Sequence, residues 1–431
     1  MIKFEEKKVN EKFFVEKLDN GLTVIVMPKK GFYKTYAVFS TKYGSQDLKF
    51  IPLNEKEYFK SPEGIAHFLE HKLFEKEECT DVANVFASLG ADVNAYTTST
   101  NTAYLFSTVD NVYESLETLI DFVQTPYFTD ASIEKERGII EQELLMYLDN
   151  PQNILYFATL KGLYKDNTVR NEIGGTVESI KDIDKELLYK CHETFYHPSN
   201  MVLVVVGNVN EEEVINFVKE NQNKKVFKPF NKPESKYYLE DTTVYEKETN
   251  ILMDVNIPKV SYGIKFPINT DNPYELLKLE TALEILVQIY FDDSSSYYEE
   301  MMDEDIINNS FSFDTYSETT YNHSIFTLDS THPMEFVNKM NEIVEIINSK
   351  EVSEIDFTRF KKYYQTLNLK RFDNIEYIAG LMVDLEHMGL NYFDLMKVVN
   401  ELTLDDINNV RKYFNLENTA YVIINPKKTI S

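Results

Sequence analysis

The residues most able to do chemistry lie in the stretch GIAHFLEHKLFE, residues 64 to 75. His67 and His71 are one helical turn apart, so their imidazoles can bind the same divalent ion, and zinc is the usual choice for mixed nitrogen and oxygen ligands. Glu70 lies between them and can take a proton from a water molecule whose acidity the metal has raised. The spacing indicates a hydrolytic metal site. The alternative is two solvated surface histidines.

A helix must position these three side chains. Residues 61 to 63 read Ser-Pro-Glu, which suits a helix start, so we expect the helix to begin there and run through Phe74. At about 100° per residue, His67, Glu70 and His71 share one face and apolar residues occupy the other. The order H-x-x-E-H is typical of inverzincin metallopeptidases.

A third protein ligand is needed to complete such a site. Residues 130 to 151 have a helical pattern in which Glu136 and Glu143, seven apart, share a face. Either carboxylate could complete the site, and spacing alone does not choose between them. The alternative for both is a solvated acidic face.

The composition restricts the partners of this 431-residue chain. A formal net charge of -27 disfavours nucleic acid and anionic membrane surfaces, and basic or neutral peptides are easier ligands, although acidic charge also serves solubility. No apolar run is long enough for a membrane span, and the first residues do not resemble a signal peptide. The only cysteines, Cys79 and Cys191, form no CxxC pair. We expect a cytoplasmic protein.

Two segments indicate an internal duplication. Residues 182–209 and 403–426 both read as a helix, a turn and an apolar strand, and they align Asn200 with Asn418 without a gap. Each half mixes strands with helices, so we expect an α+β fold of two homologous domains, each a mainly antiparallel β-sheet packed against helices. We expect three parts: an N-terminal zinc-binding peptidase domain (1–223), a polar linker with two prolines (224–241), and a C-terminal homologous domain without a zinc motif (242–431).

The H-F-L-E-H stretch, followed about seventy residues later by E-R-x-x-I-x-x-E, resembles the pitrilysin and insulinase family, close to mitochondrial processing peptidase and its bacterial relatives. The resemblance covers the whole chain. It implies that His67, His71 and Glu143 bind zinc, that Glu70 is the general base, and that Glu136 is an acidic residue next to the ligands.

The resemblance also implies a substrate-binding strand. Residues 90 to 109 are β-rich, and the corresponding strand of the family lies at a sheet edge and pairs with the backbone of an extended peptide. Asn94, Ala95 and Tyr96 would be the contact points. The alternative is an ordinary core strand.

One part of the family pattern is absent. Active members carry an arginine and a tyrosine in the second half, and here Met302 and Asn309 stand at those positions. Neither side chain replaces the missing groups. We therefore expect a dimer, preferably a heterodimer in which a sister subunit supplies the arginine and tyrosine. Asp384 and His387, three apart, form a weaker metal candidate without a third ligand.

Together these features predict a zinc-dependent endopeptidase, or the catalytic subunit of a two-chain peptidase, that acts on short or unfolded peptides. The alternative is a non-catalytic structural or assembly subunit of a peptidase-like complex.

Overall fold

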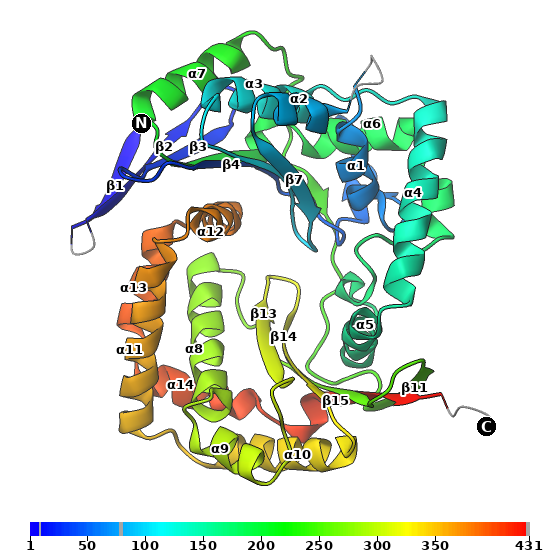
Figure 1. Cartoon of the computed structure of the whole chain (residues 1–431), viewed down its shortest axis with the longest axis vertical. Coiled ribbons are helices and arrows are strands. Elements are labelled where there is room, and N and C mark those ends of the chain that lie inside the picture. Colours follow the sequence, from blue (N-terminus) through cyan, green and yellow to red (C-terminus); the bar gives the residue numbers. More distant parts are fainter. Residues whose placement is uncertain (8–9, 77–80, 428–431) are drawn as a thin grey trace. The chain divides into compact units, whose positions relative to one another are not determined.

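A computed structural model describes residues 1–7, 10–76 and 81–427 (Figure 1). The described chain forms two compact units, and each unit collects separate segments of the sequence. Unit 1 comprises Met1–Leu144, Glu172–Tyr237 and Leu369–Tyr392. Unit 2 comprises Leu145–Asn171, Tyr238–Asn368 and the remainder from Phe393.

Unit 1 is built on a seven-stranded sheet with the order β1-β2-β3-β9-β4-β8-β7. Its strands are β1 (Ile2–Glu6), β2 (Glu11–Lys17), β3 (Thr23–Pro28), β4 (Thr35–Thr41), β7 (Asp92–Thr97), β8 (Thr102–Thr108) and β9 (Met201–Gly207). Only β3 and β9 run parallel, and every other neighbouring pair is antiparallel. A small second sheet contains β5 (Lys49–Ile51), β6 (Phe59–Lys60) and β10 (Glu234–Ser235).

Unit 2 contains a five-stranded sheet with the order β11-β15-β12-β14-β13. Its strands are β11 (Glu248–Met253), β12 (Lys259–Lys265), β13 (Ser312–Ser317), β14 (Asn322–Asp329) and β15 (Thr419–Pro426). The first pair is parallel and the other three are antiparallel, which is the same sequence of pairings as β3-β9-β4-β8-β7 in unit 1. The expected α+β fold of two related, mainly antiparallel domains is therefore confirmed.

Helices cover both sheets. In unit 1 they are α1 (Ile65–Leu73), α2 (Val82–Ser88), α3 (Val112–Gln124), most of α4 (Asp130–Leu148), α6 (Lys185–Phe195), α7 (Glu211–Asn223) and α12 (Ile375–Met388). In unit 2 they are α5 (Pro151–Leu163), α8 (Pro273–Phe291), α9 (Ser296–Asp303), α10 (Pro333–Ser349), most of α11 (Glu354–Arg371), α13 (Tyr392–Glu401) and α14 (Leu404–Val410).

The central strand β9 explains why the first sheet is covered on both faces. Its sequence MVLVVVG is buried at every position, whereas a strand with one solvent-exposed face would alternate apolar and polar residues. Leu203 and Val205 belong to the core beneath α1 and α3. Their neighbours Val204 and Val206 point to the opposite face, where α12 packs on β9 and β4. Figure 1 shows α12 in orange against this sheet.

The two halves of the chain exchange a helix. Helix α12 belongs to the second half of the sequence but packs in unit 1, and α5 belongs to the first half but packs on β15 and β12 in unit 2. The units therefore differ from the continuous boundaries 1–223, 224–241 and 242–431. The physical reason is that each sheet has apolar residues on its second face, and the helix that buries them comes from the other half.

Two further observations concern cysteines and membranes. Cys191 is a free, buried thiol, and Cys79 lies outside the described residues. Among the described helices, none combines the length and the apolar character needed to cross a bilayer.

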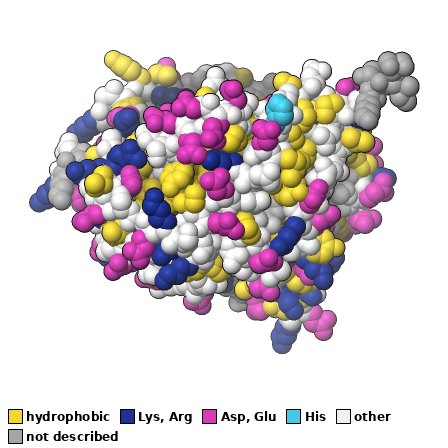
Figure 2. Space-filling model, turned by 90° about the horizontal axis from the view of Figure 1, so that it is seen from below, with side chains coloured by type: hydrophobic (Ala, Val, Ile, Leu, Met, Phe, Trp, Pro, Cys, Tyr) yellow, Lys and Arg dark blue, Asp and Glu magenta, His cyan; other side chains and the backbone are white. Residues whose placement is uncertain are grey.

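On the face drawn in Figure 2, acidic side chains are interspersed with lysines and arginines and are not gathered into a patch of one charge sign.

Candidate metal centre

Helix α1 presents the H-x-x-E-H residues, but it begins later than expected. It spans Ile65–Leu73, and its N-cap is Gly64 in the left-handed conformation (φ 86°) without a side-chain cap. Ser61 is not the cap, because its hydroxyl donates a hydrogen bond to the carbonyl of Leu48 instead. The predicted amphipathic face is present: Phe68 and its apolar neighbours are buried in the unit 1 core.

Three side chains meet at the polar face of α1. Nε2 of His67 lies 3.7 Å from Oε1 of Glu143, and Nε2 of His71 lies 3.5 Å from Oε2 of the same carboxylate. One ligand atom from each residue falls within 4.8 Å of the other two, and among the described residues this is the one such group of three. Ligand atoms about 2 Å from a tetrahedral zinc ion lie about 3.4 Å apart, so this donor set of two imidazoles and a carboxylate fits the ion.

Glu136 occupies a different place from Glu143. Its Oε1 lies 3.0 Å from Nδ1 of His71, on the side of the ring opposite the three-residue cluster. A carboxylate in this position fixes the tautomer of a ligating histidine and leaves Nε2 free to bind a metal. The helix therefore places its two glutamates, seven residues apart, at two different atoms of one imidazole.

The local electrostatics differ between the two histidines. Burial lowers the pKa of His67 to about 3, which keeps its imidazole neutral and able to act as a ligand. Burial also opposes the charged form of His71, but the hydrogen bond with Glu136 and the nearby carboxylates of Glu70 and Glu143 outweigh it and raise its pKa. The carboxylates around His71 thus favour positive charge at this point.

Glu70 is 8% exposed and lies next to this cluster. Its Oε2 accepts a hydrogen bond of 2.6 Å from the hydroxyl of Thr97, which is at the end of β7. Burial raises the pKa of Glu70, and the Thr97 hydrogen bond acts in the opposite direction. The sequence alone did not identify Thr97 as a site residue. The feature that could have pointed to it is its position one residue after Tyr96 in the predicted substrate strand.

Strand β7 is an edge strand of the seven-stranded sheet. This is the position that the family resemblance implies for the substrate-binding strand. Ala95 lines a groove of about 710 Å³ together with Glu70 and His71. Asn94 also lines it, but its side-chain oxygen accepts a hydrogen bond from the amide of Ala95. Tyr96 is half-buried, and burial and the neighbouring Asp384 raise its pKa. Of the three residues, Asn94 and Ala95 line the groove beside the histidines.

The remaining candidates from the sequence lie elsewhere. Met302 is in α9 and Asn309 follows it, and both belong to unit 2. Asp384 and His387 do not form a metal site with each other. Instead Asp384 accepts a hydrogen bond from Asn101, and Nε2 of His387 lies 2.9 Å from the hydroxyl of Ser40, so both contact the sheet on which α12 packs.

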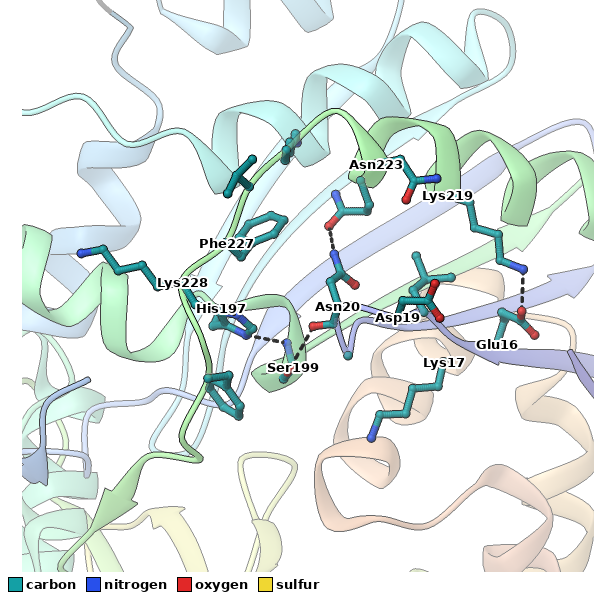
Figure 3. A pocket seen from close by; sticks show the side chains of 16 residues that line it. Glu16, Lys17, Asp19, Asn20, His197, Ser199, Lys219, Asn223, Phe227 and Lys228 are labelled. Atoms are coloured by element: carbon teal, nitrogen blue, oxygen red, sulfur yellow. Dashed lines mark hydrogen bonds and ion pairs between the residues drawn. The ribbon is translucent and has the colours of Figure 1, made fainter. Parts of the chain in front are cut away.

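A second groove in unit 1, of about 800 Å³, lies at the turn between β2 and β3 near the end of α7 (Figure 3). Four of its lining side chains are lysines, yet three of these form ion pairs with carboxylates. His197 is likewise occupied by the carbonyl of Lys228 and the amide of Ser199. The groove shares no lining residue with the one beside Glu70, and three of its four lysines and its histidine already have partners, so we assign it no part in catalysis.

Comparison with known proteins yields matches in both halves of the chain. The family model described as insulinase (peptidase family M16) matches residues 55–177, which contain the histidine motif, and the model described as the peptidase M16 inactive domain matches residues 182–364. The uncharacterized zinc protease YmfH of Bacillus subtilis is 44% identical over 419 residues, which is 95% of this chain and 96% of that protein.

Two further relatives extend the comparison. The beta subunit of the human mitochondrial-processing peptidase is 30% identical over 160 residues, 36% of this chain and 33% of that subunit. The crystal structure of an M16-like peptidase from Alicyclobacillus acidocaldarius superposes with a TM-score of 0.93 at 32% identity and covers 98% of this chain and 100% of the other. Relatives named as zinc proteases support a peptidase role. The chain belongs to the pitrilysin and insulinase family of peptidases, M16.

Proposed function

We propose that this protein is a zinc-dependent endopeptidase, or the catalytic subunit of a two-chain peptidase, that hydrolyses short or unfolded peptides. The observation that carries the proposal is the cluster of His67, His71 and Glu143 with a buried carboxylate, Glu70, beside it. We assign the three clustered residues as zinc ligands. Zinc bound there would supply a Lewis acid that polarises a peptide carbonyl and acidifies water.

The protein groups around the ligands have separate roles in this proposal. Glu136 holds His71 through Nδ1 and thereby orients Nε2 toward the cluster. Because Oε2 of Glu70 accepts the Thr97 hydrogen bond, Oε1 is the oxygen that takes a proton from the attacking water and returns it to the leaving amide nitrogen.

Strand β7 aligns the substrate. As an edge strand it can pair with the backbone of an extended peptide, a mode of binding that reads few side chains and suits unfolded substrates. Asn94 and Ala95 are the proposed contact points beside the groove, with Tyr96 following on the same strand. We further propose that basic peptides are favoured, because the chain carries a formal net charge of -27.

A partner subunit is part of the proposal. Met302 and Asn309 stand where active members of the family carry an arginine and a tyrosine, and neither can hold a substrate carbonyl as those residues do. A sister subunit that retains both would complete the site. The same two residues also favour the second candidate, a non-catalytic assembly subunit. A chain of that kind, however, has no need for three clustered ligands and a base.

The test incubates the zinc-loaded chain with a pool of unstructured peptides and monitors their cleavage by mass spectrometry. Glu70→Gln should lower turnover at least about 100-fold while zinc content stays the same, since general bases typically contribute that much. Glu117→Gln, which removes an exposed carboxylate elsewhere, is the control and should retain activity.

The outcomes separate the candidates. Cleavage that disappears in Glu70→Gln establishes a self-sufficient metallopeptidase. Zinc binding without cleavage, followed by cleavage when a family chain with the arginine and tyrosine is added, establishes the two-chain site. No cleavage in either arm rejects the peptidase in favour of the assembly subunit.

A further inference from the structure

The two proposed histidine ligands are held in different ways. Nδ1 of His71 is hydrogen-bonded to Glu136. Nδ1 of His67 is buried and has no hydrogen-bond partner among the described residues. Ligating histidines almost always use their second nitrogen to fix the orientation of the ring. Within the described part of the chain, the contact that bears on the orientation of His67 is one of packing.

That contact comes from a loop far along the chain. A Cβ atom built on Gly174 would lie 3.4 Å from Nδ1 and 3.7 Å from Cε1 of His67. The same Cβ would approach Cδ2 of Leu144 to 2.9 Å, and Leu144 directly follows the ligand Glu143. Gly174 thus lies next to the His67 ring and to the neighbour of Glu143, and a methyl group there would reach contact distance from the ring and press on Leu144.

The loop reaches this position because two backbones approach closely. Gly175 has φ +75°, and a Cβ there would lie 2.5 Å from the carbonyl oxygen of Glu63. Gly64 has φ +86°, and its Cβ would lie 2.1 Å from the carbonyl oxygen of Gly174. Side chains at either position would collide with backbone atoms that cannot rotate away, so the approach requires glycine on both sides.

A hydrogen bond closes the same contact. The hydroxyl of Ser179 donates to the carbonyl of Glu63 at 2.9 Å, and the amide of Thr176 donates to the Ser179 hydroxyl at 2.8 Å. The loop is therefore attached to the residues that immediately precede α1. It contacts both the start of the helix and one of the side chains that the helix presents.

We propose that Gly174 and Gly175, here called the glycine turn, are positioning residues that orient His67 for metal binding. The inference rests on the proposed function, because it takes the cluster to be a zinc site. Zinc affinity depends on ligand atoms placed within about half an ångström. The glycine turn fixes the start of the helix that carries His67, whereas Glu136 restrains the His71 ring by a hydrogen bond.

The test is the zinc affinity of the full chain, measured by competition with a chromophoric chelator, together with the absorption spectrum of the cobalt(II)-substituted protein. Gly175→Ala, whose new Cβ would meet the carbonyl oxygen of Glu63 at 2.5 Å, should bind zinc about 10- to 100-fold more weakly, the usual size of effect when a ligand loses its orientation. Gly174→Ala, whose new Cβ would press on Leu144, should weaken zinc binding in the same direction. Their cobalt spectra should shift in the visible region, because the ligand geometry changes.

Each variant has a matched control. Gly138→Ala adds a methyl group to the helix that carries Glu143, where nothing lies within 4 Å of the new atom. Gly389→Ala imposes the same left-handed strain (φ +81°) in open space. Both controls should keep the affinity and the cobalt spectrum of the wild-type chain, even where Gly389→Ala lowers the melting temperature.

The outcomes are distinguishable. Wild-type affinity and cobalt spectra in folded Gly174→Ala and Gly175→Ala overturn the glycine turn and leave the zinc site standing. A wild-type chain that does not bind zinc overturns the proposed function and this inference with it. If Gly175→Ala does not fold, Ser179→Ala removes the link to Glu63 without adding bulk. Unchanged affinity and spectra in Ser179→Ala and Gly174→Ala then overturn the proposal.

Discussion

As the proposed general base, Glu70 would have to be a carboxylate that is both shielded from water and held in one orientation. The structure provides both conditions: the side chain is 8% exposed, and the hydroxyl of Thr97 holds one of its oxygens. A rigid buried base reacts in one geometry, and effects of orientation of this kind are a large part of enzymatic rate enhancement. Thr97 therefore couples the proposed base to the strand proposed to bind the substrate.

Thr97→Val should lower kcat about 10- to 100-fold and leave KM and zinc content close to wild type. Valine has nearly the same shape but cannot donate the hydrogen bond, and a bond to a charged group contributes about 1.5–3 kcal/mol. Steady-state kinetics on one fluorogenic peptide measure the effect. Thr97→Ser keeps the hydroxyl and should restore most of kcat. Equal loss in both variants would show that packing, and not the hydroxyl, is what matters.

At the scale of elements, the helix exchange makes the two halves of the chain depend on each other. Helix α12 covers β4 and β9, and α5 covers β12 and β15. The buried residues of α12 include Met382 and Val383, which lie on the apolar face of this helix toward the sheet. The second half of the chain thus covers the face of the sheet opposite the H-x-x-E-H helix.

Met382→Ala should destabilise unit 1 by about 2–5 kcal/mol, because it leaves a cavity beneath α12. The measurement is the urea midpoint followed by circular dichroism, since the chain contains no tryptophan. Tyr377→Ala, on the exposed side of the same helix, serves as the control and should shift the midpoint little. Equal shifts in both variants would argue against the docking of α12 on this sheet.

At the scale of the whole molecule, several buried or half-buried histidines have lowered pKa values, which favours their neutral form. His192 hydrogen-bonds the carbonyl of Val123, and burial lowers its pKa to about 4. Burial likewise lowers the pKa of His323 and of His387 to about 3. Unfolding exposes all three and returns them toward a pKa of about 6.5, so the unfolded chain binds more protons in acid.

The folded state should therefore lose stability as the pH falls below about 6.5. For His192 the contribution is fully present above that pH and disappears as the pH approaches 4, a change of about 3 kcal/mol. His192→Gln should flatten the fall in melting temperature between pH 6.5 and 4, because glutamine does not titrate. His332→Gln, at an exposed position, is the control. Parallel pH profiles for wild type and His192→Gln would contradict the expectation.

The sequence by itself determined the features that depend on local periodicity. The face of His67, Glu70 and His71 follows from 3.6 residues per turn. The α+β duplication follows from two similar segments whose strands, β9 and β15, occupy equivalent places in their sheets. Both inferences use patterns that lie within short segments, so no knowledge of long-range contacts was required.

Only the tertiary structure decided how distant segments meet. Spacing left Glu136 and Glu143 equivalent, but packing of α4 against α1 places Glu143 at Nε2 of both histidines and Glu136 at Nδ1 of His71. Thr97 and the glycine turn reach the site from other elements. Helix α1 is capped by Gly64 and does not begin at Ser61 as expected, because the loop around Gly174 packs there. These contacts join residues tens of positions apart, and their geometry is set by the packing of the whole core, which no local pattern encodes.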